Sequence, residues 1–139
     1  MYTRGVGRIV ASVKINSVSN GSMGIRCDAL VDTGSAFLVL PSAWRDRLGK
    51  LETGGKVKVE TANQETVEGE ICGPVRIEVE GFRPIYSEVL FLDTKPIDGT
   101  YEPLLGYIVL EQCQAAVDML GYRLIPGKAI DAKQANAQV

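Results

Sequence analysis

The chain contains no histidine among its 139 residues, and this absence removes several classes of enzyme. A Ser-His-Asp or Cys-His catalytic arrangement is impossible, and so is a zinc site with histidine ligands. The three cysteines, Cys27, Cys72 and Cys113, are odd in number and far apart, so they predict no disulfide framework. Any hydrolytic chemistry must therefore use carboxylates, hydroxyls or lysines.

Basic runs and long apolar runs are also missing. The formal net charge is −2, without a basic or aromatic-basic stripe, which argues against a nucleic-acid partner. No apolar stretch approaches the length of a membrane span, and residues 1–20 lack the apolar core of a signal peptide. We therefore expect a cytoplasmic protein without a membrane or nucleic-acid partner.

The length and composition fit one ordinary globular domain. Hydrophobic residues make up 45% of the chain and charged residues 23%, and 139 residues are enough for a real core but few for two domains. We place the folded domain at residues 1–126. Residues 127–139 are small and polar, and we expect them to form a disordered C-terminal tail.

An aspartate stands between two apolar runs. Residues 29–31 lead to Asp32, and residues 37–40 follow within a few positions. Burying a carboxylate there is costly unless it accepts hydrogen bonds. Gly34 lets the backbone approach closely enough to donate to it, and Thr33 and Ser35 bring two hydroxyls beside it. Asp-Thr-Gly is also a common turn with an Asx-type hydrogen bond, so from the tripeptide alone an ordinary turn remains open.

Period-two alternation around this segment predicts mostly β structure. A hairpin is expected at residues 56–72, with a polar tip at residues 61–66 that could also be a plain surface loop. The motif Gly73-Pro74 should interrupt the chain after this hairpin. The other expected strands are 8–16, 23–31, 37–40, 75–79, 87–92, 116–118 and 122–125, with a short helix at 41–49 in which Trp44 serves packing.

A second apolar motif, Leu104-Leu105-Gly106, follows a loop of turn-forming residues. That loop contains Asp98-Gly99-Thr100, which lacks apolar flanks and is interpreted as a solvated turn. After Gly106, the β-branched and aromatic residues of 107–113 allow either a helix or a strand.

The two motifs together resemble those of the retropepsin-like aspartic proteases. The family signature is two apolar residues, Asp-Thr-Gly, Ser or Ala, and an apolar strand, followed later by two apolar residues and a glycine that pack on it. The resemblance covers residues 8–125 and is closer to single-domain bacterial members than to viral ones. It implies a mostly β fold, a closed retropepsin-like barrel with a flap hairpin and one or two short helices, with 107–113 helical.

For the site, the resemblance implies that Asp32, Thr33 and Gly34 are catalytic. Thr33 would brace the paired site across a two-fold axis, Gly34 would present backbone groups to the substrate, and Ser35 could bond the outer carboxylate oxygen. The implied substrate-binding residues are Ser35, three pocket walls and the flap tip: Leu30, Val39, Leu104, Ala62, Asn63 and Gln64. Leu30, Val39 and Leu104 could equally be plain core.

Aspartic proteolysis needs two carboxylates, and this chain offers one in the required context. The resemblance therefore implies a homodimeric aspartic endopeptidase acting on a peptide or protein, without a metal or cofactor. A non-catalytic dimerisation or peptide-binding module with the same fold is the alternative, and a Lys-Ser hydrolase has no supporting constellation. The chain also departs from retroviral members, which have a Gly-rich flap tip, acidic residues where Ala36 and Phe37 stand, and Arg where Tyr107 stands.

Overall fold

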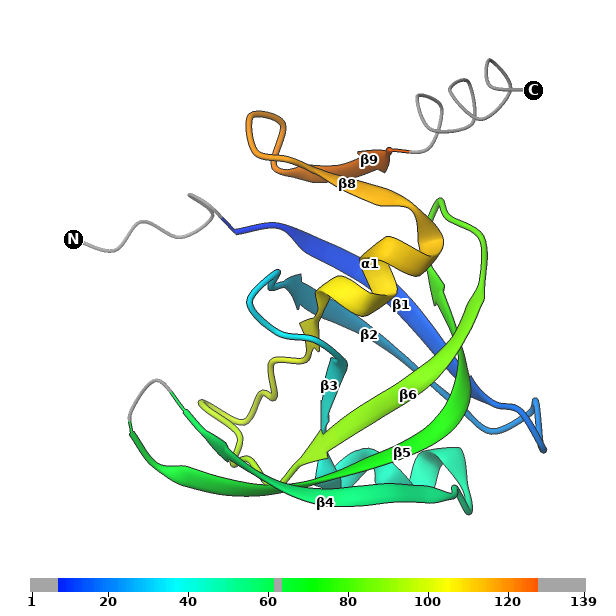
Figure 1. Cartoon of the computed structure of the whole chain (residues 1–139), viewed down its shortest axis with the longest axis vertical. Coiled ribbons are helices and arrows are strands. Elements are labelled where there is room, and N and C mark those ends of the chain that lie inside the picture. The colour runs from blue at the N-terminus through cyan, green and yellow to red at the C-terminus, as the bar shows by residue number, and fades with distance from the viewer. Residues whose placement is uncertain (1–7, 62–63, 128–139) are drawn as a thin grey trace.

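The computed structural model describes residues 8–61 and 64–127, which form a small β-barrel with two short helices (Figure 1). The tail was predicted at residues 127–139, and all of it except Gly127 lies outside the described residues, as do Ala62 and Asn63. In chain order the elements are β1 (Val10–Ser17), β2 (Gly24–Val31), β3 (Leu38–Pro41), the 3₁₀ helix η1 (Ser42–Leu48), β4 (Thr53–Glu60), β5 (Thr66–Val79), β6 (Ile85–Leu92), β7 (Leu104–Leu105), α1 (Tyr107–Cys113), β8 (Ala115–Asp118) and β9 (Arg123–Pro126).

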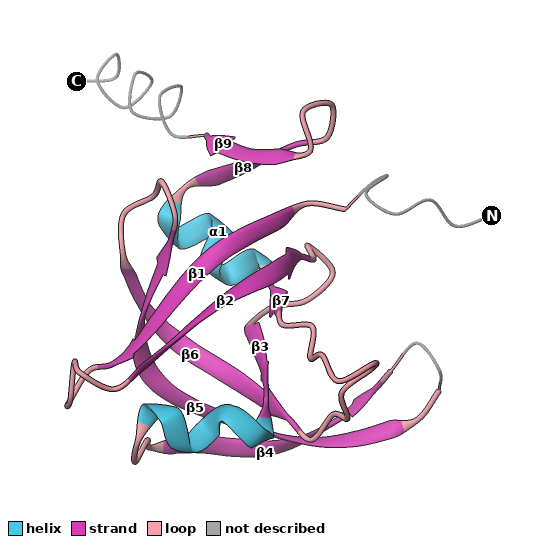
Figure 2. Cartoon of the chain, turned by 180° about the vertical axis from the view of Figure 1, so that it is seen from behind, coloured by secondary structure: helices cyan, strands magenta, loops and turns pink. Residues whose placement is uncertain are grey.

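Six of the strands close into a barrel, as the resemblance implies. The main sheet has the order β1-β2-β7-β3-β6-β5-β4, and β1 also pairs with β5, which joins the two sides (Figure 2). The pairs β2–β7 and β3–β6 are parallel, and the other pairs of this sheet are antiparallel. Closure removes most free strand edges, and of the strands in this sheet only β4 lies outside the ring.

Alternation along the strands fills the barrel. In β1, Val13 and Ile15 are buried while Val10 and Lys14 are exposed, as period-two alternation requires. The principal core, which fills the barrel, consists of Val13, Ile15, Ile25, Ala29, Leu38, Leu40, Leu48, Cys72, Val75, Ile77, Val79, Ile85, Val89, Phe91, Leu105, Val109, Leu110 and Cys113. A smaller second cluster is centred on Val39, Leu90 and Leu92.

Strand β5 is shared between two structural units. Its first half, Thr66–Cys72, pairs with β4 to form the predicted hairpin, and its second half, Val75–Val79, pairs with β1 to close the barrel. The expected interruption at Gly73-Pro74 is wrong, because the strand continues through a register shift against β6. Gly73 is needed at this bulge, since its φ is 141° and a Cβ there would lie 3.0 Å from the Cα of Glu88.

The helix predicted at residues 41–49 is a 3₁₀ helix that joins the barrel to the hairpin. Leu48 is buried in the principal core, and Arg45 forms an ion pair with Glu70 of β5. Trp44 packs edge-on against Tyr101, with ring centroids 5.8 Å apart, so its structural assignment is confirmed. The helix thus contacts the stem of the β4–β5 hairpin through Arg45 and the 93–103 loop through Trp44.

Residues after Gly106 form the helix α1, which settles the ambiguity between helix and strand. Strands β8 and β9 follow as the two last predicted strands, and they make a separate two-stranded sheet. The Asp98-Gly99 turn is exposed, as expected for a solvated turn. Within residues 8–61 and 64–127, no helix has the length and apolar character needed to cross a membrane.

Candidate active site

Asp32 lies at the end of β2 in a tight, half-exposed turn. The backbone N–H of Gly34 donates to the Asp32 carboxylate oxygen Oδ1 at 2.9 Å, and the N–H of Ser35 donates to the Asp32 carbonyl oxygen at 3.1 Å. These bonds fix the carboxylate relative to its own backbone. An ordinary Asx turn makes the same bonds, so these bonds alone do not distinguish a catalytic turn from a structural one. The contacts of the turn with neighbouring elements are needed for that distinction.

The second motif packs directly on this turn. The N–H of Asp32 donates to the carbonyl oxygen of Leu105 in β7 at 3.0 Å, which ties the aspartate backbone to the motif. Gly106 then passes so close to the next loop that a Cβ would overlap the carbonyl oxygen of Phe37 and lie 2.6 Å from the carbonyl carbon of Ala36. Only glycine fits this approach, so the two motifs form one structural unit.

Helix α1 begins on the same loop. The N–H groups of Tyr107 and Ile108 donate to the carbonyl oxygens of Ser35 and Ala36, at 2.8 and 3.0 Å. No side chain caps the helix, so these carbonyl groups satisfy amides that would otherwise lack partners. The loop after Asp32 is thereby held between β7 and α1.

The three predicted pocket walls meet around β7. Leu104 lies opposite Leu30 of β2 on one side and opposite Val39 of β3 on the other. Val39 is buried, whereas Leu30 and Leu104 are half-buried. Val39 and Leu104 belong to the second cluster, which also contains apolar residues of the hairpin stem. The structure therefore brings these three walls together beside the Asp32 turn.

Stem residues of the hairpin are a part of this apolar cluster that the sequence-based site did not include. The stem contributes Val57, Val59, Val67 and Ile71, whose side chains pack against Val39, Leu90 and Leu92. Their alternation along β4 and β5 was visible in the sequence and was used only to predict strands. The same alternation also predicts which face of the hairpin packs toward Leu104.

The other predicted residues are placed as follows. Thr33 is exposed, and the Ser35 hydroxyl donates to the carbonyl oxygen of Phe37 at 3.3 Å, where the resemblance implied a bond to the Asp32 carboxylate.

Gln64 is exposed, with φ 65°, and its N–H donates to the carbonyl oxygen of Thr61 at 2.8 Å. Ala62 and Asn63, the remaining flap-tip residues, lie outside the described residues.

The cysteines offer little competing chemistry. Burial, aided by the negative charge of Asp28, raises the pKa of the Cys27 thiol from 9.0 to about 11. Burial also raises the pKa of Cys113. Both thiols therefore stay protonated at neutral pH, when a nucleophile or metal ligand would need a thiolate. In the part of the chain that the structure describes, no three acidic or cysteine side chains gather as a metal site.

Comparison with known families decides the assignment. The family model described as aspartyl protease matches residues 11–109, a segment that contains both motifs and ends inside α1. The chain belongs to the aspartyl protease family. The retropepsin-like resemblance inferred from the two motifs is confirmed.

Structural comparison supports the fold of this family member. The structure of EIAV protease complexed with the inhibitor HBY-793 is similar, with a TM-score of 0.55 and 22% sequence identity. The similarity covers 81% of this chain and 93% of that one. No curated protein sequence matches the chain significantly. Strands β8 and β9 lie beyond the segment that the family model matches.

Proposed function

We propose that this chain is an aspartic endopeptidase whose active form is a homodimer with two Asp32 carboxylates at one site. One observation carries the proposal. Asp32 is held by the Gly34 amide at 2.9 Å, in a turn that is fixed by β7 and α1, and each chain supplies only one such turn among its described residues. Membership of the aspartyl protease family supports the same chemistry.

The chemistry requires a pair of carboxylates that share one proton. The ionised Asp32 takes a proton from a water molecule, whose oxygen bonds to the scissile carbonyl carbon, while the protonated Asp32 donates to the carbonyl oxygen. The resulting tetrahedral intermediate breaks its C–N bond as the amine nitrogen takes the proton that the first carboxylate accepted from water, and the second carboxylate recovers its proton from a hydroxyl of the intermediate. Two like charges this close do not both ionise readily, so the pair keeps the single proton that the reaction uses.

Thr33, Gly34 and Ser35 surround the carboxylate in this proposal. Thr33 is exposed and free to bond across the two-fold axis of a dimer. A Cβ at position 34 would lie only 3.2 Å from Oδ1 of Asp32, so glycine keeps the approach to the carboxylate open. The Ser35 hydroxyl supports the loop through the Phe37 carbonyl group, which gives it a positioning role.

The substrate is proposed to be a peptide with apolar side chains next to the cleaved bond. Leu30 and Leu104 are half-buried beside the Asp32 turn, and the inner face of the hairpin stem is apolar at Val57 and Ile71. A peptide held between the stem and β7 would bury its apolar side chains against these residues. Gln64, with Ala62 and Asn63, is proposed to contact the peptide from the flap tip.

A peptide-library digestion tests the function. Wild type should cleave a mixed library, and Asp32→Asn should lose at least a hundredfold in rate because the shared proton is removed while size is kept. Asp98→Asn is the matched control, since Asp98 lies in an exposed Asp-Gly-Thr turn, and it should retain full activity. Wild type that leaves every peptide intact, but binds some of them, would instead favour a non-catalytic peptide-binding module.

A further inference from the structure

A groove on the outer face of the barrel lies away from the Asp32 turn. It encloses about 350 Å³, and we call it the basic groove. In both views the turn between β1 and β2, which forms part of the groove, projects away from the turn between β2 and β3 that carries Asp32 (Figures 1 and 2). The chemistry at Asp32 therefore does not explain this groove. Its lining includes Lys14, Asn16, Val18, Gly21, Arg76 and Tyr86, which come from β1, the turn after β1, β5 and β6.

Strand pairing places part of the groove in one row across three strands. Asn16 of β1 lies opposite Arg76 of β5, and Arg76 lies opposite Tyr86 of β6. Side chains directly opposite each other in antiparallel strands point to the same face of the sheet. Tyr86 is 57% exposed, so this row carries an aromatic side chain next to a guanidinium group on the outer surface.

The next row along β1 is basic. Lys14 lies opposite Arg26 of β2 on one side and opposite Glu78 of β5 on the other. Glu78 forms an ion pair with Arg76 at 3.1 Å, whereas Lys14 and Arg26 have no ion-pair partner in the part of the chain that the structure describes. Like charges directly opposite each other weaken strand pairing, so the Lys14–Arg26 pair does not serve the stability of the fold.

The turn that forms one wall of the basic groove is held by its own hydrogen bonds. The side-chain amide of Asn16 donates to the carbonyl oxygen of Gly21 at 3.1 Å, and the N–H of Asn20 donates to the hydroxyl oxygen of Ser17 at 3.2 Å. A Cβ at Gly24 would lie 2.6 Å from Nδ2 of Asn16, so glycine leaves room for this side chain. The wall is thus preorganised, which lowers the entropic cost of binding a ligand.

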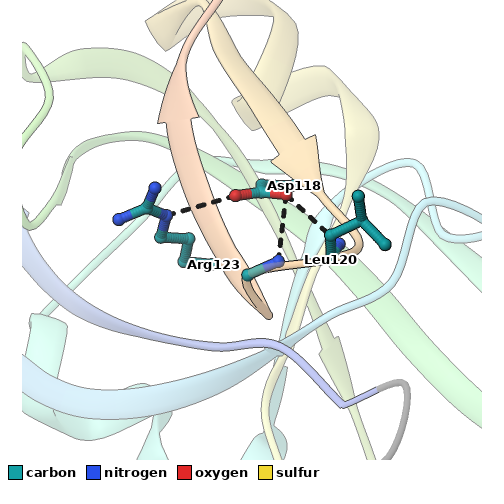
Figure 3. Close-up of polar contacts among 4 residues, drawn as sticks. Asp118, Leu120 and Arg123 are labelled. Carbon is teal, nitrogen blue, oxygen red and sulfur yellow. Dashed lines mark hydrogen bonds and ion pairs between the residues drawn. The ribbon is translucent and has the colours of Figure 1, made fainter.

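A cation near the far end of the molecule provides a contrast. Arg123 begins β9, and its Nε donates to Oδ2 of Asp118 at 3.2 Å (Figure 3). Oδ1 of the same carboxylate accepts the N–H groups of Leu120 and Gly121 at 3.2 and 3.0 Å. These donors, led by the Gly121 amide, lower the pKa of Asp118, so the carboxylate stays ionised at neutral pH. The charge of Arg123 is therefore matched within its own turn, unlike those of Lys14 and Arg26.

We propose that the basic groove binds an acidic segment of a polypeptide. Carboxylates of the segment pair with Lys14 and Arg26, whose charges are unmatched, and with Arg76. An apolar side chain of the segment packs against Tyr86 and against Val18, which is 55% exposed. Charge complementarity selects this partner, because carboxylates replace the repulsion between Lys14 and Arg26 with attraction.

Acidic residues limit how far such a ligand extends. Asp28 lies opposite Ser12, two positions before Lys14 in β1, and the N–H of Glu80 donates to the carbonyl oxygen of Ser12 at 3.0 Å. Asp28 and Glu80 therefore border the cations on the side toward Asp32. A long polyanion such as nucleic acid would meet these carboxylates, whereas a short acidic segment would not.

In the proposed protease, the basic groove recruits a protein substrate, and this role rests on the proposed function. Arg26 stands six positions before Asp32 on the outward alternation of β2, which corresponds to roughly 20 Å along the strand. A substrate can therefore hold the groove through an acidic segment and present a separate segment to Asp32. Binding in the groove needs no catalysis.

Fluorescence anisotropy of a labelled peptide, about six glutamates followed by a tyrosine, tests the binding at low ionic strength. The full chain carries Asp32→Asn so that the peptide stays intact. Lys14→Gln combined with Arg76→Gln should raise the dissociation constant at least tenfold, because two charge-assisted contacts are lost. Glu78→Gln should lower it, because this acid no longer competes for Arg76, and misfolding cannot cause a gain in affinity. Arg123→Gln is the matched control and should bind as the parent protein does.

The anisotropy measurement can overturn the proposal in three ways. The acidic peptide does not bind, or it binds the double variant as tightly as the parent protein. Glu78→Gln leaves the affinity unchanged or weakens it. Single-stranded DNA or phosphatidylserine vesicles bind the groove more tightly than the peptide and displace it, which would assign the groove to nucleic acid or to a membrane surface instead.

The recruiting role has a separate readout in cleavage kinetics of the wild-type chain. A cleavable peptide is joined to the acidic segment by about twelve Gly and Ser residues, which span roughly 20 Å. Its KM should be at least tenfold lower than that of the peptide without the acidic segment, at equal kcat, and the Lys14→Gln, Arg76→Gln double variant should remove this difference. Cleavage with equal KM values would overturn the recruiting role and leave the protease standing. Groove binding without any cleavage would support the groove and overturn the protease.

Discussion

The backbone N–H of Tyr107 donates to the carbonyl oxygen of Ser35 at 2.8 Å, so helix α1 starts on the loop that leaves Asp32. The resemblance to retroviral proteases implied Arg where this chain has Tyr107. In this chain the backbone, which any residue supplies, makes the contact to the loop. The Tyr107 side chain is exposed, and this contact to the loop does not require it.

Gly106→Ala is expected to disturb the site more than the fold. The added methyl would overlap the Phe37 carbonyl oxygen, so the loop after Asp32 must move. We expect a loss of about 1–3 kcal/mol in the free energy of unfolding, the usual cost of overpacking. Peptide cleavage should fall at least tenfold. Urea unfolding and cleavage assays measure both, with Gly21→Ala as the control, since a Cβ there meets nothing within 4 Å. Unchanged cleavage in Gly106→Ala would mean that the loop position does not matter.

Cleavage should show a bell-shaped pH profile on the acid side of neutrality. The rate needs one protonated and one ionised Asp32, so it should fall when the pair holds two protons and again when it holds none. The chain has no histidine to titrate between its carboxylates and its cysteines. Rates measured from about pH 3 to about pH 8, with circular dichroism as a check on folding, test this expectation. A flat profile from a folded protein contradicts the shared proton.

Mixed dimers should be inactive if each chain supplies half of the site. With a ninefold excess of Asp32→Asn chains, only roughly one wild-type chain in ten finds a wild-type partner, so activity per wild-type chain should fall roughly tenfold. Asp98→Asn chains in the same excess should leave activity unchanged. When wild type alone is diluted to concentrations below the dimer dissociation constant, its specific activity should also fall. If neither the excess of Asp32→Asn chains nor dilution changes the activity, the whole active site must lie in one chain.

The Cys27 thiol should make stability depend on alkaline pH. Its pKa is raised to about 11 in the fold, so the protonated thiol is favoured by folding. This stabilisation is fully present below the ordinary value of 9.0 and is lost as the pH rises toward about 11. Urea unfolding at about pH 8 and about pH 10.5 should show a smaller loss of stability in Cys27→Ala than in wild type. Equal losses of unfolding free energy in the two proteins would contradict the raised pKa of Cys27.

The Asp32 turn and the main hairpins could be predicted because their signals are local. Asn20-Gly21 lies between two alternating runs, and the side-chain amide oxygen of Asn20 accepts the N–H of Ser22 at 3.2 Å, as in an Asx turn. Asp32 stands between apolar strands that the pattern already identifies. For these elements, the residues that make the contacts are neighbours in the sequence.

Helix α1 could not be predicted from its own residues, because what stabilises it comes from elsewhere. Ile108 and Val109 favour strands, and the helix has no Ser, Thr or Asp cap. Its first amides find acceptors at Ser35 and Ala36, about seventy residues earlier in the chain, and tertiary contacts of this kind override local propensity. The same holds for Gly73, where a bulge accommodates a Gly-Pro pair that the sequence alone would place in a turn.

The pairing of β5 has a consequence for how the length of the flap can vary. Residues 66–68 pair with β4 alone, whereas residues 69–72 also pair with β6 of the barrel and closure against β1 starts at Val75, so only the outer part of the flap can change length without changing the register of the barrel. Adding two residues to each arm of the flap would preserve its alternation of inward and outward side chains and leave the barrel pairing untouched. Adding one residue to one arm of this outer part would turn Val59 or Val67, which pair with each other, toward solvent. The length of the flap can therefore change in steps of two residues while the barrel stays the same.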